Sequence, residues 1–135
     1  MKVPKFYKKD GSEDVARAAR YERIVHGLAH LKGTTVPCPA LGGVDVIISK
    51  AGIEEVAYHA SKSIKSTSAA LDIVNQIRKA GNPKVSYPKT NQQTNKFRFI
   101  AMFVLSGRHD GNTTKITIGA KSNGKYLQYC LTVVE

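Results

Sequence analysis

The chain has 135 residues, with 21 lysine and arginine side chains against 10 acidic ones, which gives a formal net charge of +11. This length fits a single domain with an ordinary core, and the charge favours a polyanion or an acidic protein as partner. No run approaches the ~18 apolar residues of a membrane span, which argues against a helical membrane protein. Two cysteines, Cys38 and Cys130, stand outside any Cys/His cluster, so neither a disulfide framework nor structural zinc is indicated.

The positive charge is uneven along the chain. Residues 1–43 carry +4, residues 44–80 carry +1 and residues 81–135 carry +6. Such an excess also suits a small domain that only needs solubility. The N-terminus lacks the apolar run of a secretory signal. We therefore expect both thiols to be reduced and the protein to act in the cytoplasm, either as made or delivered there as the C-terminal part of a secreted polypeptide.

Residues 1–43 are predicted to form a basic lead-in, one helix and a linker. The helix is predicted to run from Ser12 to about Leu31, with acidic residues at its positive N-terminal end and Gly33 as its stop. Residues 34–43 contain the sequence Val-Pro-Cys-Pro-Ala-Leu-Gly-Gly. Because this run mixes stiff and permissive residues, it is predicted to be a connector that ends the N-terminal part.

Residues 44–135 are predicted to form the main α+β body. Apolar spacing and β-branched runs indicate, in chain order, a strand at 44–49, a short helix at 53–61, a second helix at about 66–79, a strand at 85–87, a polar loop at 88–95, a central strand at 97–105, a loop at 107–114 and a final hairpin. The predicted fold is thus N-terminal helices packed on one face of a mainly antiparallel sheet of four to five strands.

The last twenty-one residues are predicted to be a hairpin with two chemically different faces. Asn123-Gly124 predicts a two-residue type I′ turn, which pairs Ile118 with Tyr129 and Thr117 with Cys130. Strand alternation then defines an apolar face that packs on the core. The opposite face carries ammonium groups, hydroxyls and an amide, on Lys115, Thr117, Lys121, Tyr126, Gln128, Cys130 and Thr132. Groups of these kinds bind phosphate and ribose.

This layout resembles the toxin nucleases grouped with barnase, EndoU, the tRNase colicins and RelE. The resemblance covers about residues 44–134 and includes Ser49-Lys-Ala-Gly-Ile53, Tyr58-His-Ala-Ser61 and Lys115-Ile-Thr-Ile-Gly119. It implies RNA cleavage without a metal or other cofactor, by combinations of histidine, arginine, lysine, threonine and tyrosine. It also implies a neutralising acidic immunity or antitoxin protein, and a place at the C-terminus of a longer phage-associated or polymorphic toxin.

The chemistry of such cleavage selects candidate residues. It needs a base near the ribose 2′-hydroxyl, cations around the phosphorus and an acid for the leaving oxygen. His59, at the edge of a helical apolar face, is the predicted acid or base, and its alternative is a partly buried histidine bonded to a carbonyl. Arg98 and Lys115 are predicted to hold the phosphate, with Thr117 orienting it. Ordinary cross-strand packing is the alternative for the hairpin residues.

Further candidates contact substrate in this hypothesis. Gln128 is predicted to orient phosphate or ribose, and Tyr126 to donate a proton or stack on a base, although a rim tyrosine is the alternative. Lys62 and Lys65 are predicted to line the phosphate path, although interhelix solvation explains them equally well. His109 is predicted to lie in a mobile loop near the substrate as a second acid or base, and a solvent-exposed loop residue is its default alternative. The helical spacing of Glu22, His26 and His30 is compatible with zinc but is also common on solvated helices, so no metal site is predicted.

The sequence therefore predicts a metal-independent endoribonuclease domain of toxin type that cleaves tRNA or another structured RNA. The alternatives are a non-catalytic RNA- or protein-binding module that uses the same basic sheet face, and a structural adaptor with residues 1–43 as its interaction arm.

Overall fold

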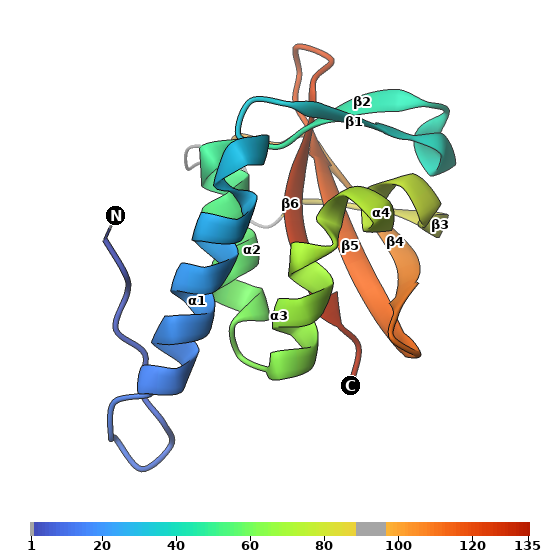
Figure 1. The fold of residues 1–135 in the computed structure, drawn as a ribbon. Helices are drawn as coiled ribbons and strands as arrows, with labels where there is room; N and C mark the ends of the chain where they lie inside the picture. Colours follow the sequence, from blue (N-terminus) through green and yellow to red (C-terminus); the bar gives the residue numbers. More distant parts are fainter. Residues whose placement is uncertain (1, 89–96) are drawn as a thin grey trace.

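A computed structural model describes residues 2–88 and 97–135 of the chain. The described elements are, in chain order, α1 (Val15–Leu28), a 3₁₀ turn (Ala29–Leu31), β1 (Thr35–Cys38), a 3₁₀ turn (Pro39–Leu41), β2 (Val44–Ile47), α2 (Lys50–Ala60), α3 (Ile64–Leu71), α4 (Ile73–Lys79), β3 (Gly81–Ser86), β4 (Ala101–His109), β5 (Asn112–Ala120) and β6 (Tyr126–Val133). The helices lie on one side of a curled sheet (Figure 1).

The sheet has six strands in the order β1-β2-β6-β5-β4-β3. The pairing of β2 with β6 is parallel, and the other four pairings are antiparallel. The predicted α+β class is confirmed, but the sheet is larger than the predicted four to five strands. The polar loop predicted at 88–95 lies, apart from Pro88, outside the described residues.

The additional strand, β1, lies in the segment predicted to be a connector. Its side chains alternate between exposed and buried positions, and Val36 and Cys38 enter the core. The prolines and glycines of this segment predict a connector, and Pro37 cannot donate a ladder hydrogen bond. The strand tolerates Pro37 since β1 stands at the edge of the sheet, where such a donor is not needed on the outer side.

The N-terminal segment shares one core with the rest of the chain. Tyr21, Ile24 and Leu28 of α1 are buried in the same cluster as residues of α2, α4 and the central strands. Helix α1 is shorter than predicted, because Asp14 rather than Ser12 caps it by accepting a hydrogen bond from the Arg17 amide at 3.0 Å. Residues before and after the predicted boundary at residue 43 therefore form one hydrophobic core.

The helices after β2 follow the predicted pattern with one difference. Helix α2 ends at Ala60, as its apolar spacing predicts, and Ser49 caps its start. The single helix predicted at 66–79 is instead two short helices, α3 and α4, with Ser63 capping α3. The break falls at Asp72, whose φ and ψ of −99° and 24° lie outside the helical range.

Register within the final hairpin differs from the prediction near its turn. Gly124, with φ of 84°, is a left-handed residue in a three-residue loop, whereas Asn123 is not. Consequently Ile118 pairs with Gln128, although Thr117 pairs with Cys130 as predicted. An irregularity between Thr117 and Ile118 restores the register by inserting one extra residue in β6. Residues 126–129 of β6 therefore face the opposite way from the prediction.

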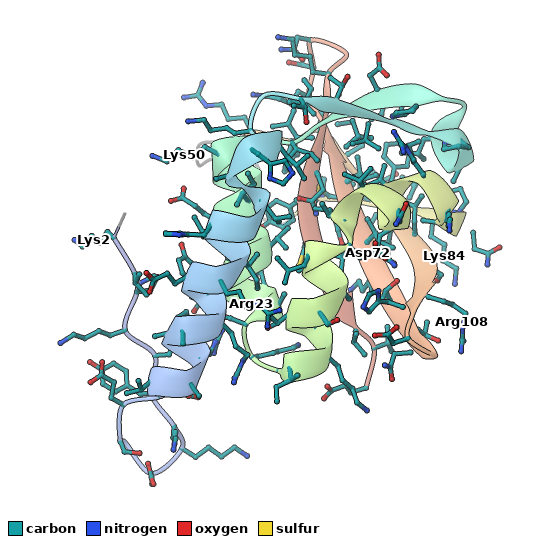
Figure 2. All side chains as sticks on the ribbon, viewed as in Figure 1. Lys2, Arg23, Lys50, Asp72, Lys84 and Arg108 are labelled. Carbon is teal, nitrogen blue, oxygen red and sulfur yellow. The ribbon has the colours of Figure 1, made fainter. Side chains whose placement is uncertain are left out.

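The β4–β5 hairpin is tied to the helices by polar side chains. The His109 ring contacts the Asp72 carboxylate through Nδ1 at 3.1 Å and the Ser68 hydroxyl through Nε2 at 2.9 Å. Nearby, the Thr114 hydroxyl donates to the Gln76 side-chain oxygen at 2.6 Å. His109 thus ends β4 and faces the helices, so its predicted place in a mobile loop near the substrate is wrong. Figure 2 shows Asp72 at the junction of α3 and α4.

The hydrogen bonds of the Asp72 carboxylate make the unfolding free energy at low pH depend in part on this residue. Burial acts to raise the pKa of the Asp72 carboxyl, but hydrogen bonds from Asn75, His109 and Gln76 outweigh it, so the pKa lies below its usual range. A lowered native pKa stabilises the fold fully above the unfolded value of about 3.9, and that contribution is lost as the pH falls through the native pKa. We expect the unfolding free energy of Asp72→Asn, measured in urea titrations, to fall less steeply with pH below pH 4 than that of the wild type. The same pH dependence in both proteins would contradict this assignment.

Candidate active site

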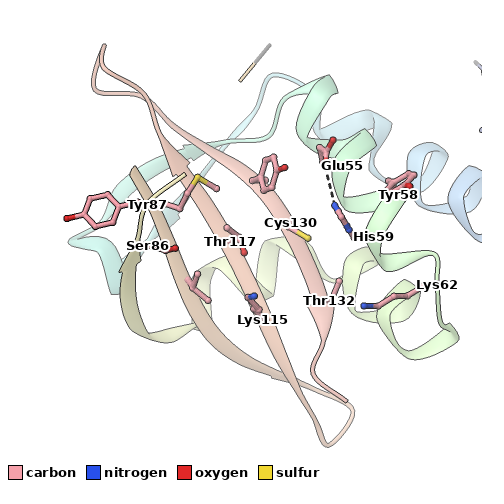
Figure 3. Close-up of a pocket in the computed structure, with 13 residues that line it drawn as sticks. Glu55, Tyr58, His59, Lys62, Ser86, Tyr87, Lys115, Thr117, Cys130 and Thr132 are labelled. Atoms are coloured by element: carbon pink, nitrogen blue, oxygen red, sulfur yellow. Dashed lines mark ion pairs between the residues drawn. The ribbon is translucent and has the colours of Figure 1, made fainter. Parts of the chain in front are cut away.

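The helix-free face of the sheet forms a cleft of about 570 Å³ beside helix α2. Below, "the cleft" means this cavity. Its polar lining comes from α2 and the turn after it, from the end of β3 and from the two hairpin strands: Glu55, Tyr58, His59, Lys62, Ser86, Tyr87, Lys115, Thr117, Tyr129, Cys130 and Thr132. Figure 3 shows α2 along one side of the cleft and the strands forming its floor.

Alternation in β5 places two of the predicted residues on this floor. Ile116 and Ile118 are fully buried on the helix-covered face, and consecutive strand residues point to opposite faces. Lys115 and Thr117 therefore face the cleft, as the sequence analysis predicts.

His59 reaches the cleft from the edge of α2. Val56 and Ala60 are fully buried under the helix, while the side chain of His59 keeps 44% of its surface exposed. The structure thus brings together three of the four predicted catalytic residues, His59, Lys115 and Thr117, and adds Lys62 from the predicted substrate-binding set.

Glu55 is a cleft residue that the sequence analysis missed. Its Oε2 atom lies 3.3 Å from Nε2 of His59, one helical turn away. When the imidazole is protonated this contact is an ion pair. The i, i+4 spacing of a glutamate and a histidine on one helix was the signal that would have identified it.

The end of α2 that carries His59 is held by helix α1. The Arg17 guanidinium donates to the Tyr58 carbonyl oxygen at 2.6 Å and to the Ser61 hydroxyl at 3.3 Å. Arg20 donates to the Ser61 carbonyl oxygen at 2.7 Å. Cationic side chains at these carbonyls satisfy orphan acceptors and oppose the negative end of the helix dipole. Residues of the N-terminal segment therefore fix the part of α2 that carries the histidine.

Two predicted substrate-binding residues lie on the other face of the sheet. Because the extra residue in β6 reverses the alternation near the turn, Tyr126 packs against the main core and Gln128 is completely buried. Leu127 and Tyr129, which are predicted on the core face, lie on the cleft side instead, and Tyr129 lines the cleft itself. The predictions that Tyr126 and Gln128 share a face with Lys115 are therefore wrong.

The remaining predicted residues are outside the cleft lining. Arg98 precedes β4 instead of lying within it, is exposed, and has a φ of 51°, a conformation that a strand excludes. Lys65 is exposed on α3, one turn beyond Lys62. Neither residue is among the described side chains that line the cleft, whose lysines are Lys62 and Lys115.

Burial makes Cys130 a poor nucleophile although its thiol shares the cleft with His59. Burial first, and the charge of Glu55 second, raise the pKa of the Cys130 thiol to about 11. A thiol at this pKa is about one-thousandth ionised at pH 8, and the thiolate is the reactive form. The cleft therefore does not present a cysteine–histidine nucleophile.

We expect iodoacetamide at pH 8 to alkylate Cys130 on the order of 100-fold more slowly in the native protein than in urea, because an ordinary thiol of pKa ~8.5 is about one-quarter ionised at that pH. Peptide mass spectrometry would separate this site from Cys38. Native labelling as fast as unfolded labelling would show that the thiol is activated.

Neither a metal cluster nor a membrane helix is found in the described parts of the chain. No three His, Cys, Asp or Glu side chains there form a group suited to a metal ion, and Glu22 and His26 of α1 with His30 of the 3₁₀ turn after it do not make one. No helix among the described residues is long and apolar enough to cross a bilayer.

Comparisons of the chain with models of protein families, with curated proteins and with solved structures found no match. The resemblance to toxin nucleases therefore remains a prediction from the sequence.

Proposed function

We propose that the cleft is the active site of a metal-independent endoribonuclease. The observation that supports this most is the meeting of His59, Lys115 and Thr117, from elements more than fifty residues apart in sequence, in one cavity with Glu55 and Lys62. An imidazole, a carboxylate, two ammonium groups and a hydroxyl are together the groups that cleavage by a ribose 2′-hydroxyl requires.

The proposed reaction uses Glu55 and His59 as the acid–base pair. One of them accepts the proton of the 2′-hydroxyl, whose oxygen attacks the neighbouring phosphorus. The bond to the 5′ oxygen breaks, and that oxygen takes a proton from the other member of the pair. The products are a 2′,3′-cyclic phosphate and a free 5′-hydroxyl, so atoms and charges balance without a further reactant.

The cations and the hydroxyl act on the phosphate. Lys62 and Lys115 stabilise the charge that builds on the non-bridging oxygens, and the Thr117 hydroxyl donates to one of them. These groups stand in a partly enclosed cavity, where such interactions are stronger than in open water.

The proposed substrate is tRNA or another structured RNA in the cytoplasm. A protein of net charge +11 attracts RNA at long range, and the same charge suits an acidic immunity or antitoxin protein as the neutralising partner. Basic side chains such as Arg23, Lys50, Lys84 and Arg108 project from several sides of the molecule (Figure 2).

The test incubates the purified chain with a short RNA in excess chelator and identifies the new ends. We expect cleavage to persist and to leave 2′,3′-cyclic phosphates, while a matched oligonucleotide with one 2′-deoxy position stays intact at that position. Intact RNA, or cleavage that stops with chelator, would contradict the proposal. Binding without cleavage would favour a non-catalytic RNA-binding module instead.

A further inference from the structure

Tyr58 presents a fixed, half-exposed ring to the cleft beside His59. Its ring centroid lies 5.3 Å from that of His59, with the two planes nearly perpendicular at 86°. The residue keeps 49% of its surface exposed and lines the cavity. An exposed aromatic ring beside an imidazole is unlike the rest of α2, whose apolar residues are buried.

The N-terminal segment holds this ring in place. The buried ring of Phe6 packs against it with centroids 5.7 Å apart, and the Arg17 guanidinium carbon lies 5.3 Å from its centroid. Arg17 also lies 4.1 Å from the centroid of Phe6 and binds the Tyr58 backbone. Because the ring is already ordered, little conformational freedom remains to be lost when a planar group stacks on it.

A second exposed tyrosine lies at the opposite end of the cleft. Tyr87 follows β3, lines the same cavity and is 86% exposed. Figure 3 shows Tyr58 and Tyr87 on opposite sides, with Lys115 and Thr117 between them and the Tyr87 ring directed outward from the strands. Three strand spacings separate β3 from β6 in the sheet, about 14 Å, which leaves room for more than one nucleotide.

We propose that the cleft binds single-stranded RNA, with one unpaired base stacked on Tyr58 next to the reacting phosphate and a further base on Tyr87. Aromatic rings along a basic groove are the usual means of binding single strands, since every base offers a flat face once it leaves a duplex. Lys62 and Lys115 contact the backbone between the two bases. This inference rests on the proposed function and narrows its substrate to the unpaired segments of a structured RNA.

The experiment measures binding separately from cleavage. Fluorescence anisotropy of a labelled RNA octamer, alone and as a duplex, is recorded with the full-length His59→Ala protein, which keeps the RNA intact. We expect the single strand to bind at least tenfold more tightly than the duplex. Adding Tyr58→Ala is expected to weaken single-strand binding about 5- to 150-fold, and adding Tyr58→Phe to leave it within about twofold.

Two further variants separate the loss of the Tyr58 ring from a loss of stability and from the loss of any exposed tyrosine. Tyr58→Leu retains apolar bulk against Phe6 without a flat ring, so it should weaken binding as Tyr58→Ala does even if the alanine variant is unstable. Tyr7→Ala changes an exposed tyrosine outside the cleft and should have no effect.

Equal affinity for strand and duplex, or full affinity in Tyr58→Leu, would overturn the inference even if the wild-type protein cleaves RNA. Tyr58-dependent single-strand binding without cleavage by the wild type would instead support it and overturn the nuclease proposal.

Discussion

Replacing His59 with alanine is expected to lower the rate of RNA cleavage by about 10²- to 10⁴-fold, the usual contribution of a positioned acid or base. The imidazole is in the cleft and contacts Glu55 at 3.3 Å, so its loss removes one of the two proton-transfer groups. The fold should be retained, because the side chain is half-exposed at the edge of α2 and such surface changes usually alter the unfolding free energy by less than ~0.5 kcal/mol.

The matched control is His26→Ala, which removes an exposed histidine from α1, away from the cleft. Cleavage of a defined RNA and urea unfolding are measured for both variants. We expect His26→Ala to cleave like the wild type. Equal cleavage by the wild type, His59→Ala and His26→Ala would show that another group carries out the proton transfers. If the cleavage lost in His59→Ala were no larger than the fraction of that protein that is unfolded, no catalytic role would be left for His59.

Gly52→Ala is expected to lower the unfolding free energy by about 1–3 kcal/mol, the usual effect of overpacking. Gly52 packs α2 closely on β6: a Cβ atom added there would overlap the carbonyl oxygen of Gln128, which belongs to the strand backbone and has no rotamer to change. Since α2 carries Glu55 and His59, the helix displacement that relieves this overlap should also slow cleavage.

Helix propensity acts in the opposite direction, because alanine is favoured over glycine by about 1 kcal/mol inside a helix. Gly27→Ala is the control, since this helical glycine would meet the terminal Cδ2 of Leu71 at 2.6 Å, and a flexible side chain can move away. Urea denaturation should therefore show a clearly smaller loss for Gly27→Ala. A Gly52→Ala protein as stable as the wild type would contradict the close packing of α2 on β6.

Local patterns in the sequence predict the parts of the site that depend on simple periodicity. The alternation of Lys115 and Thr117 with two isoleucines places them on the open face of the sheet, and the spacing of Ile53, Val56 and Ala60 places His59 at a helix edge. Both predictions hold because each depends on only one element and one repeat.

The errors arise where a backbone irregularity intervenes. Asn123-Gly124 predicts a two-residue turn, but only Gly124 takes a positive φ, and the extra residue in β6 moves Gln128 into the core. The apolar neighbours of Arg98 predict a strand there, although the φ of 51° at Arg98 prevents one. One inserted residue or one reversed dihedral cannot be recognised from the spacing of apolar residues. It nevertheless moves every following side chain to the other face of the sheet, until a second irregularity restores the alternation.

Long-range contacts also could not be predicted from the chain alone. Arg17 and Phe6 are more than forty residues from Tyr58 in sequence, yet together they fix its ring and the end of α2. Residues 1–43 contact the main body through the pairing of β1 with β2, which Pro37 conceals in the sequence, and through single side chains such as Arg17 and Phe6, which leave no repeated pattern.

The central claim is that His59 and Lys115 act on the same phosphodiester, and a double-mutant cycle on kcat/KM tests it directly. We predict that His59→Ala and Lys115→Ala each lower kcat/KM for a short RNA and that the double variant loses at least tenfold less than the product of the two losses, as expected for groups that share one transition state. The control cycle pairs His59→Ala with Lys125→Ala, which changes an exposed cation of the same hairpin outside the cleft. Losses that multiply independently for His59 and Lys115, or no loss from either change, would contradict the account.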